Sequence, residues 1–210
     1  MLCLTRGMAA TNRGGAKSGE ELSAMRTEEF YAACRLLKVT HPAILDYPDG
    51  GLAGLSLLDV AGEITRRIRE IKPQVILTLG VEGTVTAHVD HSMVGLFTTA
   101  AFHWAGRTDR FREQLDSGLQ PHRAQKLYYV TASQTWPERQ PVSLAPVTAR
   151  VDVRKYIDTK IDAFRVHESQ RALLEKYGDR SLRQPEELFH LAATVTPQSA
   201  TEETDLFAGV

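Results

Sequence analysis

The stretch VILTLGVEGTVTAHVDH, residues 75–91, decides the fold of this 210-residue chain. Its first five residues, Val75–Leu79, are apolar or β-branched, which is typical of a strand buried on both faces of a parallel sheet. Gly80–Gly83 then predicts a turn, and a helical pattern starts near Ser92. The motif HVDH, residues 88–91, is therefore expected where a strand gives way to a helix. Open α/β sheets hold their sites at that edge.

Two histidines three residues apart, with a carboxylate between them, have two readings. They can supply a metal ligand, a proton-transfer group and a carboxylate that tunes one imidazole. They can equally form a hydrogen-bonded turn that caps the next helix. A catalytic zinc centre normally needs three protein ligands and an open position for water, so the motif cannot complete one alone. The residues themselves leave both readings open.

Composition limits the class of protein. The 25 basic and 26 acidic residues leave no charge excess to attract a nucleic acid or an anionic membrane, and no run of 18 apolar residues could span a bilayer. A length of 210 residues suits a single domain, residues 1–210. The two cysteines, Cys3 and Cys34, suit reduced thiols better than a disulfide framework. These features predict a cytoplasmic protein.

Strand and helix patterns alternate on both sides of the motif. Capping boxes at Ser18–Glu21 and at Ser56–Asp59 predict helix starts, and Pro73 should end the second helix. The helices are expected at 20–37, at 57–72, from about 92 and over 153–164, and the strands at 2–4, 41–47, 75–79, 126–130 and 188–192. This alternation predicts an α/β fold with a mostly parallel sheet.

Several short motifs follow one another along nearly the whole chain. They are Leu4–Gly7, the helix around Glu21-Leu22 and Arg26, the loop Asp46–Gly50, the HVDH motif, Lys160 with His167–Gln170, and Asp205–Gly209. Together they resemble the PIG-L or LmbE-like family of N-acetylglucosaminyl deacetylases. The resemblance implies a Rossmann-like three-layer sandwich and a zinc-dependent hydrolase that removes the acetyl group from an N-acetylated amino sugar or sugar conjugate.

The resemblance also implies roles for the HVDH motif. His91 matches a zinc ligand, His88 the group that stabilises or protonates the tetrahedral intermediate, and Asp90 the partner that tunes His88. The chemistry is consistent, because bound zinc polarises an amide carbonyl and acidifies its water, and an imidazolium can neutralise an oxyanion or protonate a leaving amine.

Four residues outside the motif are further candidates. Arg26 and Asp49 match positions implied to bind the sugar. His167 and Gln170 belong to a family-like string and are candidate site residues, although a histidine at a helix end can also simply complement the helix dipole.

The chain departs from the family pattern twice. The usual motif is Gly-His-Pro-Asp-His, whereas here Ala87 precedes the first histidine and Val89 follows it. The family's first strand also ends in His-Pro-Asp-Asp-Glu, which supplies two zinc ligands and the general base, and residues 1–210 contain no such string. We expect that strand and its helix upstream of Met1. Residues 1–210 alone are then expected to bind zinc weakly and to lack turnover, because His91 is their single family-matched ligand.

Other readings stay open at this stage. His41, Asp46 and Asp49 flank one strand and loop and could act as substitute metal ligands. The loop at Gly14-Gly15 lacks the glycine spacing of a P-loop or of a dinucleotide-binding site. The hypothesis that the chain is a nucleotide-binding module therefore rests on fold analogy alone. A second hypothesis is an inactive family member that acts only in binding or in oligomerisation, including association into a homo-oligomer. The sequence leaves open which sugar conjugate is used and whether zinc or iron is the metal.

Overall fold

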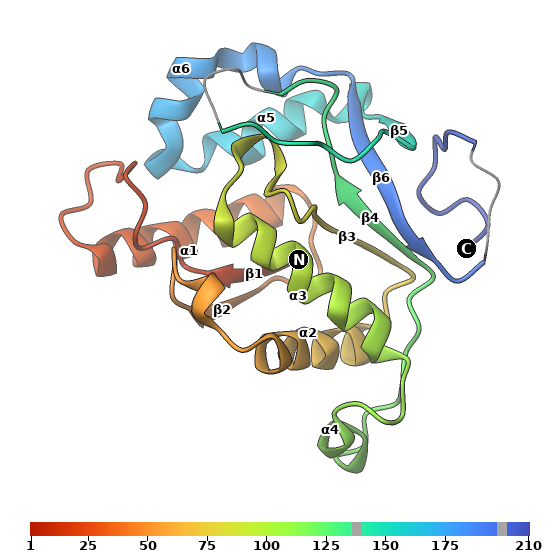
Figure 1. Ribbon diagram of the computed structural model, residues 1–210. Helices are drawn as coiled ribbons and strands as arrows, with labels where there is room; N and C mark the ends of the chain where they lie inside the picture. The colour runs from red at the N-terminus through yellow and green to blue at the C-terminus, as the bar shows by residue number, and fades with distance from the viewer. Residues whose placement is uncertain (136–139, 197–200) are drawn as a thin grey trace. The chain divides into compact units, whose positions relative to one another are not determined.

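A computed structural model describes residues 1–135, 140–196 and 201–210 and confirms the α/β class (Figure 1). The elements are β1 (Leu2–Thr5), α1 (Gly19–Leu36), β2 (Ala43–Tyr47), α2 (Leu57–Ile71), β3 (Val75–Leu79), α3 (Val89–Ala105), α4 (Arg112–Asp116), β4 (Lys126–Val130), β5 (Ala149–Asp152), α5 (Ile157–Arg165), α6 (Arg171–Leu182) and β6 (Glu186–Thr194). The sequence patterns had not indicated α4, β5 or α6. No helix among the described residues is long and apolar enough to cross a membrane.

Both predicted capping boxes form. The Ser18 hydroxyl accepts a hydrogen bond from the Glu21 backbone N–H at 3.0 Å and so begins α1. The Ser56 hydroxyl accepts from the Asp59 N–H at 3.3 Å and begins α2. This second helix ends at Lys72, which has a left-handed φ of 54° and is followed by Pro73.

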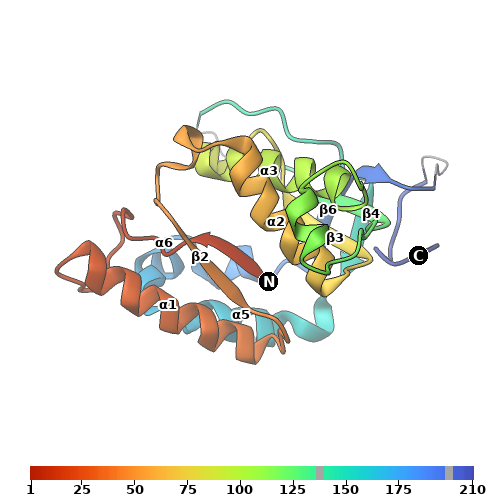
Figure 2. The ribbon, with the colours of Figure 1, turned by 90° about the horizontal axis from the view of Figure 1, so that it is seen from below.

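The described residues form two compact units, and each is built from separate stretches of the chain. Unit 1 contains residues 1–51 and 152–187, and unit 2 contains residues 52–151 and 188–210. In unit 1, β1 and β2 form a parallel two-stranded sheet with Leu2 opposite Ala43, and α1 packs against α5 (Figure 2). One domain over residues 1–210 stays a prediction.

Unit 2 contains a four-stranded sheet in the order β3-β4-β6-β5, and α2 and α3 pack against each other beside it (Figure 1). The pair β3 and β4 is parallel and in register, with Leu79 opposite Val130, and β6 runs antiparallel to β4. No strand pairing among the described residues joins this sheet to β1 and β2, so the strands form two sheets. The edge of β3 opposite β4 therefore has no strand partner within the described chain.

The core of unit 2 is built on both faces of β4. Leu127 packs with Phe102 of α3 and with Ala124, whereas the next residue, Tyr128, packs with Ala149 and Phe189. Successive side chains of a strand point to opposite faces, so each face of β4 is covered by a different layer.

A buried ion pair joins β4 to the end of the described chain. Lys126, which is 1% exposed, places its Nζ 2.6 Å from Glu203 Oε1. The Tyr128 hydroxyl donates to the other carboxylate oxygen of Glu203. Burial, and then the Glu203 carboxylate, raise the pKa of Tyr128 well above its ordinary value. The phenol therefore stays protonated and remains a donor.

A second buried cation, Arg69 of α2, joins α2 to the carboxyl end of α3. Its side chain is 1% exposed, and the guanidinium donates to Gln114 Oε1 at 3.0 Å and to four backbone carbonyls, those of Ala105, Arg107, Arg110 and Phe111. Burial lowers the pKa of Arg69. All five N–H groups have acceptors, so this arginine organises the turn that follows α3.

Candidate functional site

The HVDH motif lies at the carboxyl end of β3, where it begins α3. The helix starts at Val89, earlier than the predicted start near Ser92, and His88 is its N-cap. The His88 Nδ1 accepts the Asp90 backbone N–H at 3.1 Å. The capping reading of the motif is therefore confirmed. Because Nδ1 accepts, the neutral ring carries its proton on Nε2, which is free to donate to another group.

The ring of the second histidine, His91, is oriented by a hydrogen bond to the preceding turn. His91 Nδ1 lies 3.1 Å from Thr86 Oγ1, and the Thr86 hydroxyl donates to the Gly83 carbonyl at 3.1 Å. Thr86 then accepts from His91 Nδ1–H, which leaves the lone pair on His91 Nε2. Burial, reinforced by His88, lowers the pKa of His91, so the ring is neutral at pH 7. A neutral ring whose other nitrogen donates to an oxygen is the usual state of a metal-ligating histidine.

We predict that Thr86→Val weakens zinc binding at His91 by roughly tenfold, because the acceptor that orients the ring is lost. A zinc titration with a competing chelator measures the effect. Ser92→Ala, one residue along α3, is the matched control and should keep the parent affinity. Equal affinities of parent and Thr86→Val would show that the hydroxyl does not orient the ring.

Asp90 anchors the start of α3. Its side chain is buried, and Oδ1 accepts the Leu52 backbone N–H at 3.2 Å. The contact between Asp90 and His88 runs through the backbone N–H, so the tuning of His88 by the Asp90 carboxylate stays a prediction. The imidazole rings of His88 and His91 lie 5.1 Å apart between centroids.

The described residues do not fit a complete zinc centre. Within residues 1–135, 140–196 and 201–210, no group of three histidine, cysteine, aspartate or glutamate side chains could hold a metal ion. His41, Asp46 and Asp49 are accordingly not brought together as a substitute ligand set. A catalytic zinc normally has three ligands from protein, and the role of His91 as one of them stays a prediction.

The turn between β3 and His88 has a constrained backbone. Gly83 has a φ of 78°, and a Cβ at this position would lie 2.6 Å from the His88 carbonyl oxygen. Ala87 has a φ of 51°, in the left-handed region that glycine adopts more easily. Gly95 of α3 permits a second close approach, because its Cβ would lie 2.5 Å from the Leu79 carbonyl oxygen. These positions hold the motif against the end of β3.

Two substitutions in this turn should change the free energy of unfolding in opposite directions. Ala87→Gly should raise the free energy of unfolding by about 0.5–1 kcal/mol, because the left-handed conformation no longer strains a Cβ. Gly83→Ala should lower it by roughly 1–3 kcal/mol, because the added Cβ meets the His88 backbone. Urea denaturation measures both values. A loss of stability in Ala87→Gly would contradict this account of the turn.

The candidate sugar-binding residues of unit 1 both hold the loop after β1. Arg26 Nη1 donates to the Gly7 carbonyl at 3.2 Å, and Arg26 Nε is buried without a partner among the described residues. Asp49 accepts from the Thr5 hydroxyl at 3.2 Å and from the Ala9 N–H at 2.9 Å. The free Nε of Arg26 could still donate to a ligand oxygen. Sugar binding by either residue stays a prediction.

The string His167–Gln170 contacts α1 within the same unit. The buried carboxylate of Glu29 accepts from the Ser169 N–H at 2.7 Å and from its hydroxyl at 2.6 Å, and His167 Nδ1 lies 3.7 Å from it. Gln170 Nε2 donates to Ser169 Oγ at 3.3 Å. These contacts give the string a structural role. The candidate site roles of His167 and Gln170 stay predictions.

Residues 1–102 match the profile of the PIG-L family, described as GlcNAc-PI de-N-acetylase. These residues belong to the PIG-L family. The resemblance predicted from the short motifs is therefore confirmed. The PIG-L segment includes His88, Asp90, His91, Arg26 and Asp49, and it ends before the string that begins at His167.

Curated relatives of the chain include deacetylases. A diacetylchitobiose deacetylase from Thermococcus kodakarensis is 30% identical over 170 residues, which cover 80% of this chain and 58% of the relative. A 1D-myo-inositol 2-acetamido-2-deoxy-alpha-D-glucopyranoside deacetylase from Acidothermus cellulolyticus is 27% identical, over 93% of this chain and 77% of the relative. The chain thus spans less than two thirds of the length of the first relative.

Solved structures share the fold. The N,N'-diacetylchitobiose deacetylase from Pyrococcus horikoshii aligns with a TM-score of 0.74 at 23% identity, over 90% of this chain and 71% of that one. The 4-carboxy-2-hydroxymuconate hydratase GalB from a Pseudomonas aligns with a TM-score of 0.62 at 16% identity, over 94% and 85%. One fold therefore carries different reactions, and function must be argued from the site.

Glu82, in the turn that follows β3, was not among the candidate residues expected from the sequence. Glu82 Oε1 is buried and has no hydrogen-bond partner among the described residues. A buried carboxylate oxygen without a partner is uncommon and calls for a water or a cation. The available signal was a carboxylate between Gly80 and Gly83, directly after a buried strand.

Proposed function

We propose that the protein hydrolyses the amide bond of an N-acetylated amino sugar or sugar conjugate and releases acetate and a free amine. The observation that carries the proposal is the 3.1 Å hydrogen bond between His91 Nδ1 and the Thr86 hydroxyl, which orients the His91 ring and leaves the Nε2 lone pair available for a ligand role. The PIG-L membership of residues 1–102 and the deacetylase relatives support the same reaction.

His88 is the proposed proton donor. Breaking the C–N bond of an amide leaves an amine nitrogen that must gain a proton, and a positioned imidazole can supply it. While His88 Nδ1 accepts the Asp90 N–H the ring is neutral, and its Nε2–H can donate a hydrogen bond to the developing oxyanion. Transfer of a proton to the leaving nitrogen uses the imidazolium, whose second proton lies on Nδ1, so the cap opens when the ring is protonated. Asp90 is proposed to support this role by holding the first turn of α3 in place.

Zinc is the proposed cofactor, with His91 as one ligand. The described residues do not group the other two that a catalytic centre needs, so the proposal assigns the chain a single ligand. Arg26 and Asp49 are proposed to contact the sugar. We also propose a reducing compartment such as the cytoplasm, supported by the free thiols of Cys3 and Cys34.

The test compares two preparations. The first is the protein at its natural length, purified from its own organism through a tag at its carboxyl end, and the second is residues 1–210. Amine release from N-acetylglucosamine and diacetylchitobiose is measured at saturating zinc, together with a zinc titration. The natural-length protein should release amine, and residues 1–210 should bind zinc weakly and lack turnover, because His91 is a single ligand.

Each contrary outcome has a defined meaning. No amine release by the natural-length protein would overturn the proposal and favour a module that only binds or oligomerises. Tight zinc binding with turnover by residues 1–210 would require replacement ligands. His41, Asp46 and Asp49 would then be the first residues to substitute.

A further inference from the structure

Two fully buried groups of unit 2 hold a single carboxylate. Lys126 and Tyr128 lie two residues apart on β4, so their side chains leave the same face of the strand, and their exposed fractions are 1% and 0%. Lys126 Nζ and the Tyr128 hydroxyl contact different oxygens of the Glu203 carboxylate. A buried ammonium without a paired anion is costly. Lys126 and Tyr128 therefore form a slot that selects a carboxylate.

The backbone that carries Glu203 is bound to the edge strand β5. The Arg150 N–H donates to the Glu203 carbonyl at 2.8 Å, and the Glu203 N–H donates to the Thr148 carbonyl at 2.9 Å. These bonds make a parallel bridge between Ala149 and Glu203, beside the last strand in the order β3-β4-β6-β5 (Figure 1). Addition of an extended segment to the edge of a sheet is a general mode of peptide recognition.

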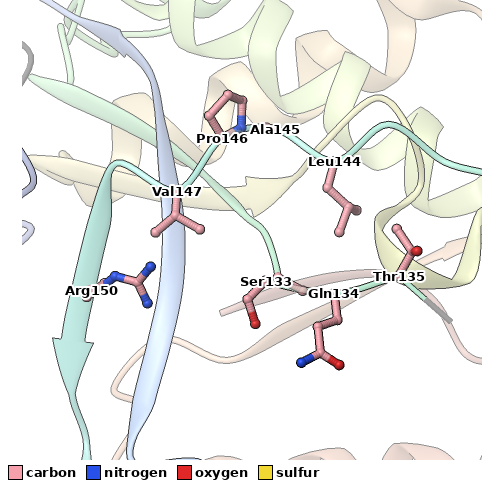
Figure 3. Close-up of a pocket in the computed structure, with 9 residues that line it drawn as sticks. Ser133, Gln134, Thr135, Leu144, Ala145, Pro146, Val147 and Arg150 are labelled. Atoms are coloured by element: carbon pink, nitrogen blue, oxygen red, sulfur yellow. The ribbon is translucent and has the colours of Figure 1, made fainter.

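Two neighbours of Glu203 add a charged and an apolar contact. The Glu202 carboxylate lies 3.1 Å from Arg150 Nε, and Figure 3 shows the Arg150 side chain projecting from β5. Leu206 packs against the buried cluster that contains Tyr128, and its carbonyl accepts from the Tyr128 hydroxyl at 3.4 Å. The site therefore fits an extended acidic segment in which a leucine follows a glutamate by three residues.

The same segment is exposed at its other positions. Residues 201, 202, 204, 205 and 207 are exposed, whereas Glu203 and Leu206 are partly buried. A segment anchored by two side chains and by backbone hydrogen bonds at one residue can open locally while the rest of the unit stays folded. We name residues 202–206 the strap.

We propose that Lys126, Tyr128 and the edge of β5 form a binding site for an extended acidic peptide with the pattern Glu-x-x-Leu, and that the strap occupies this site until such a peptide displaces it. The partner is a protein with an exposed segment of this chemistry. Apolar or basic segments are excluded, because they would leave the Lys126 ammonium unpaired. The strap is a competitor within the same molecule, so it lowers the apparent affinity for the partner by the fraction of molecules whose site is open.

The test uses a fluorescent peptide of residues 201–210 and the chain of residues 1–210. Anisotropy measures its binding to the parent chain and to the Glu203→Gln chain, whose own strap is weakened. The peptide should bind the Glu203→Gln chain at least about tenfold more tightly than the parent, because the competitor has lost a charged hydrogen bond. On the Glu203→Gln chain, a peptide with the same substitution should bind about tenfold more weakly than the unchanged peptide.

A Thr204→Ala peptide is the matched control, because Thr204 is exposed between the two anchors, and it should keep the affinity of the unchanged peptide. Equal affinity of the two chains, equal affinity of the unchanged and Glu203→Gln peptides, or no binding to the Glu203→Gln chain would each overturn the proposal. If circular dichroism shows that this chain is unfolded, Leu206→Ala replaces it. That variant keeps the ion pair and weakens the other anchor, so the same differences are expected.

Sedimentation of the parent chain tests whether the strap binds within its own molecule. The parent should stay monomeric at the concentrations used for anisotropy. A parent that dimerises, together with a Glu203→Gln chain that does not, would assign the strap to the site of a second copy and would contradict its role as a competitor within one molecule.

Discussion

Replacing His88 with asparagine is expected to lower kcat for amine release by about 10²-fold or more, because the proton donor is lost. Asparagine is a good N-cap residue and keeps an acceptor for the Asp90 N–H, so α3 should remain capped. Stability and bound zinc should therefore stay at the parent level. The measurements are kcat and elemental analysis on the natural-length protein.

Two further variants separate the roles of the histidines. His88→Ala should show the same fall in kcat and also lose about 1 kcal/mol of stability, because the cap is removed. His91→Ala should lose zinc. His103→Ala, near the other end of α3, should change neither kcat nor the amount of bound zinc. Equal zinc loss in the His88 and His91 variants would show that the roles of ligand and proton donor are wrongly divided.

Arg69→Met is expected to give the largest loss of stability. The substitution leaves buried carbonyls without donors after α3, and the free energy of unfolding should fall by roughly 3–5 kcal/mol. Methionine has a similar length and keeps the apolar contacts of the stem, so the loss reports on the hydrogen bonds. Urea denaturation measures the change.

The matched control for this variant lies on the same helix. Arg66, whose side chain is 40% exposed, pairs with Glu63 at 3.7 Å, and such a surface pair contributes little. Arg66→Met should change stability by less than about 0.5 kcal/mol. A similar effect of the two substitutions would show that the hydrogen bonds of Arg69 do not stabilise the turn after α3.

The local signals were sufficient for most elements of the fold. The capping boxes at Ser18 and Ser56 predicted the starts of two helices. The strand Val75–Leu79 was predicted with the bounds that the structure shows. These signals act through neighbouring residues, so a sequence displays them. The division into two sheets depends on which strand edges meet, and that depends on long-range pairing with no local signature.

The candidate site was predictable in its residue types but not in its hydrogen bonds. The HVDH spacing indicated a ligand and a proton-transfer group, yet the state of His91 depends on where the Thr86 hydroxyl donates. The burial of Arg69 was equally hidden, because four of its five acceptors are backbone carbonyls that no residue type reveals. A glutamate between glycines is typical of a solvated turn, so the sequence did not indicate that a Glu82 carboxylate oxygen is buried.

The ion pair between Lys126 and Glu203 can form only after both residues have been synthesised, so the folding of unit 2 depends on the timing of protein synthesis. The two residues are 77 positions apart, so at about 5–20 residues per second the ribosome adds Glu203 roughly 4 to 15 s after Lys126. For most of that interval β4 also lacks β6, its antiparallel neighbour, which is complete only at Thr194. The nascent strand therefore emerges with an uncompensated lysine and an open edge, and both stay unpaired until the carboxyl-terminal residues have been made.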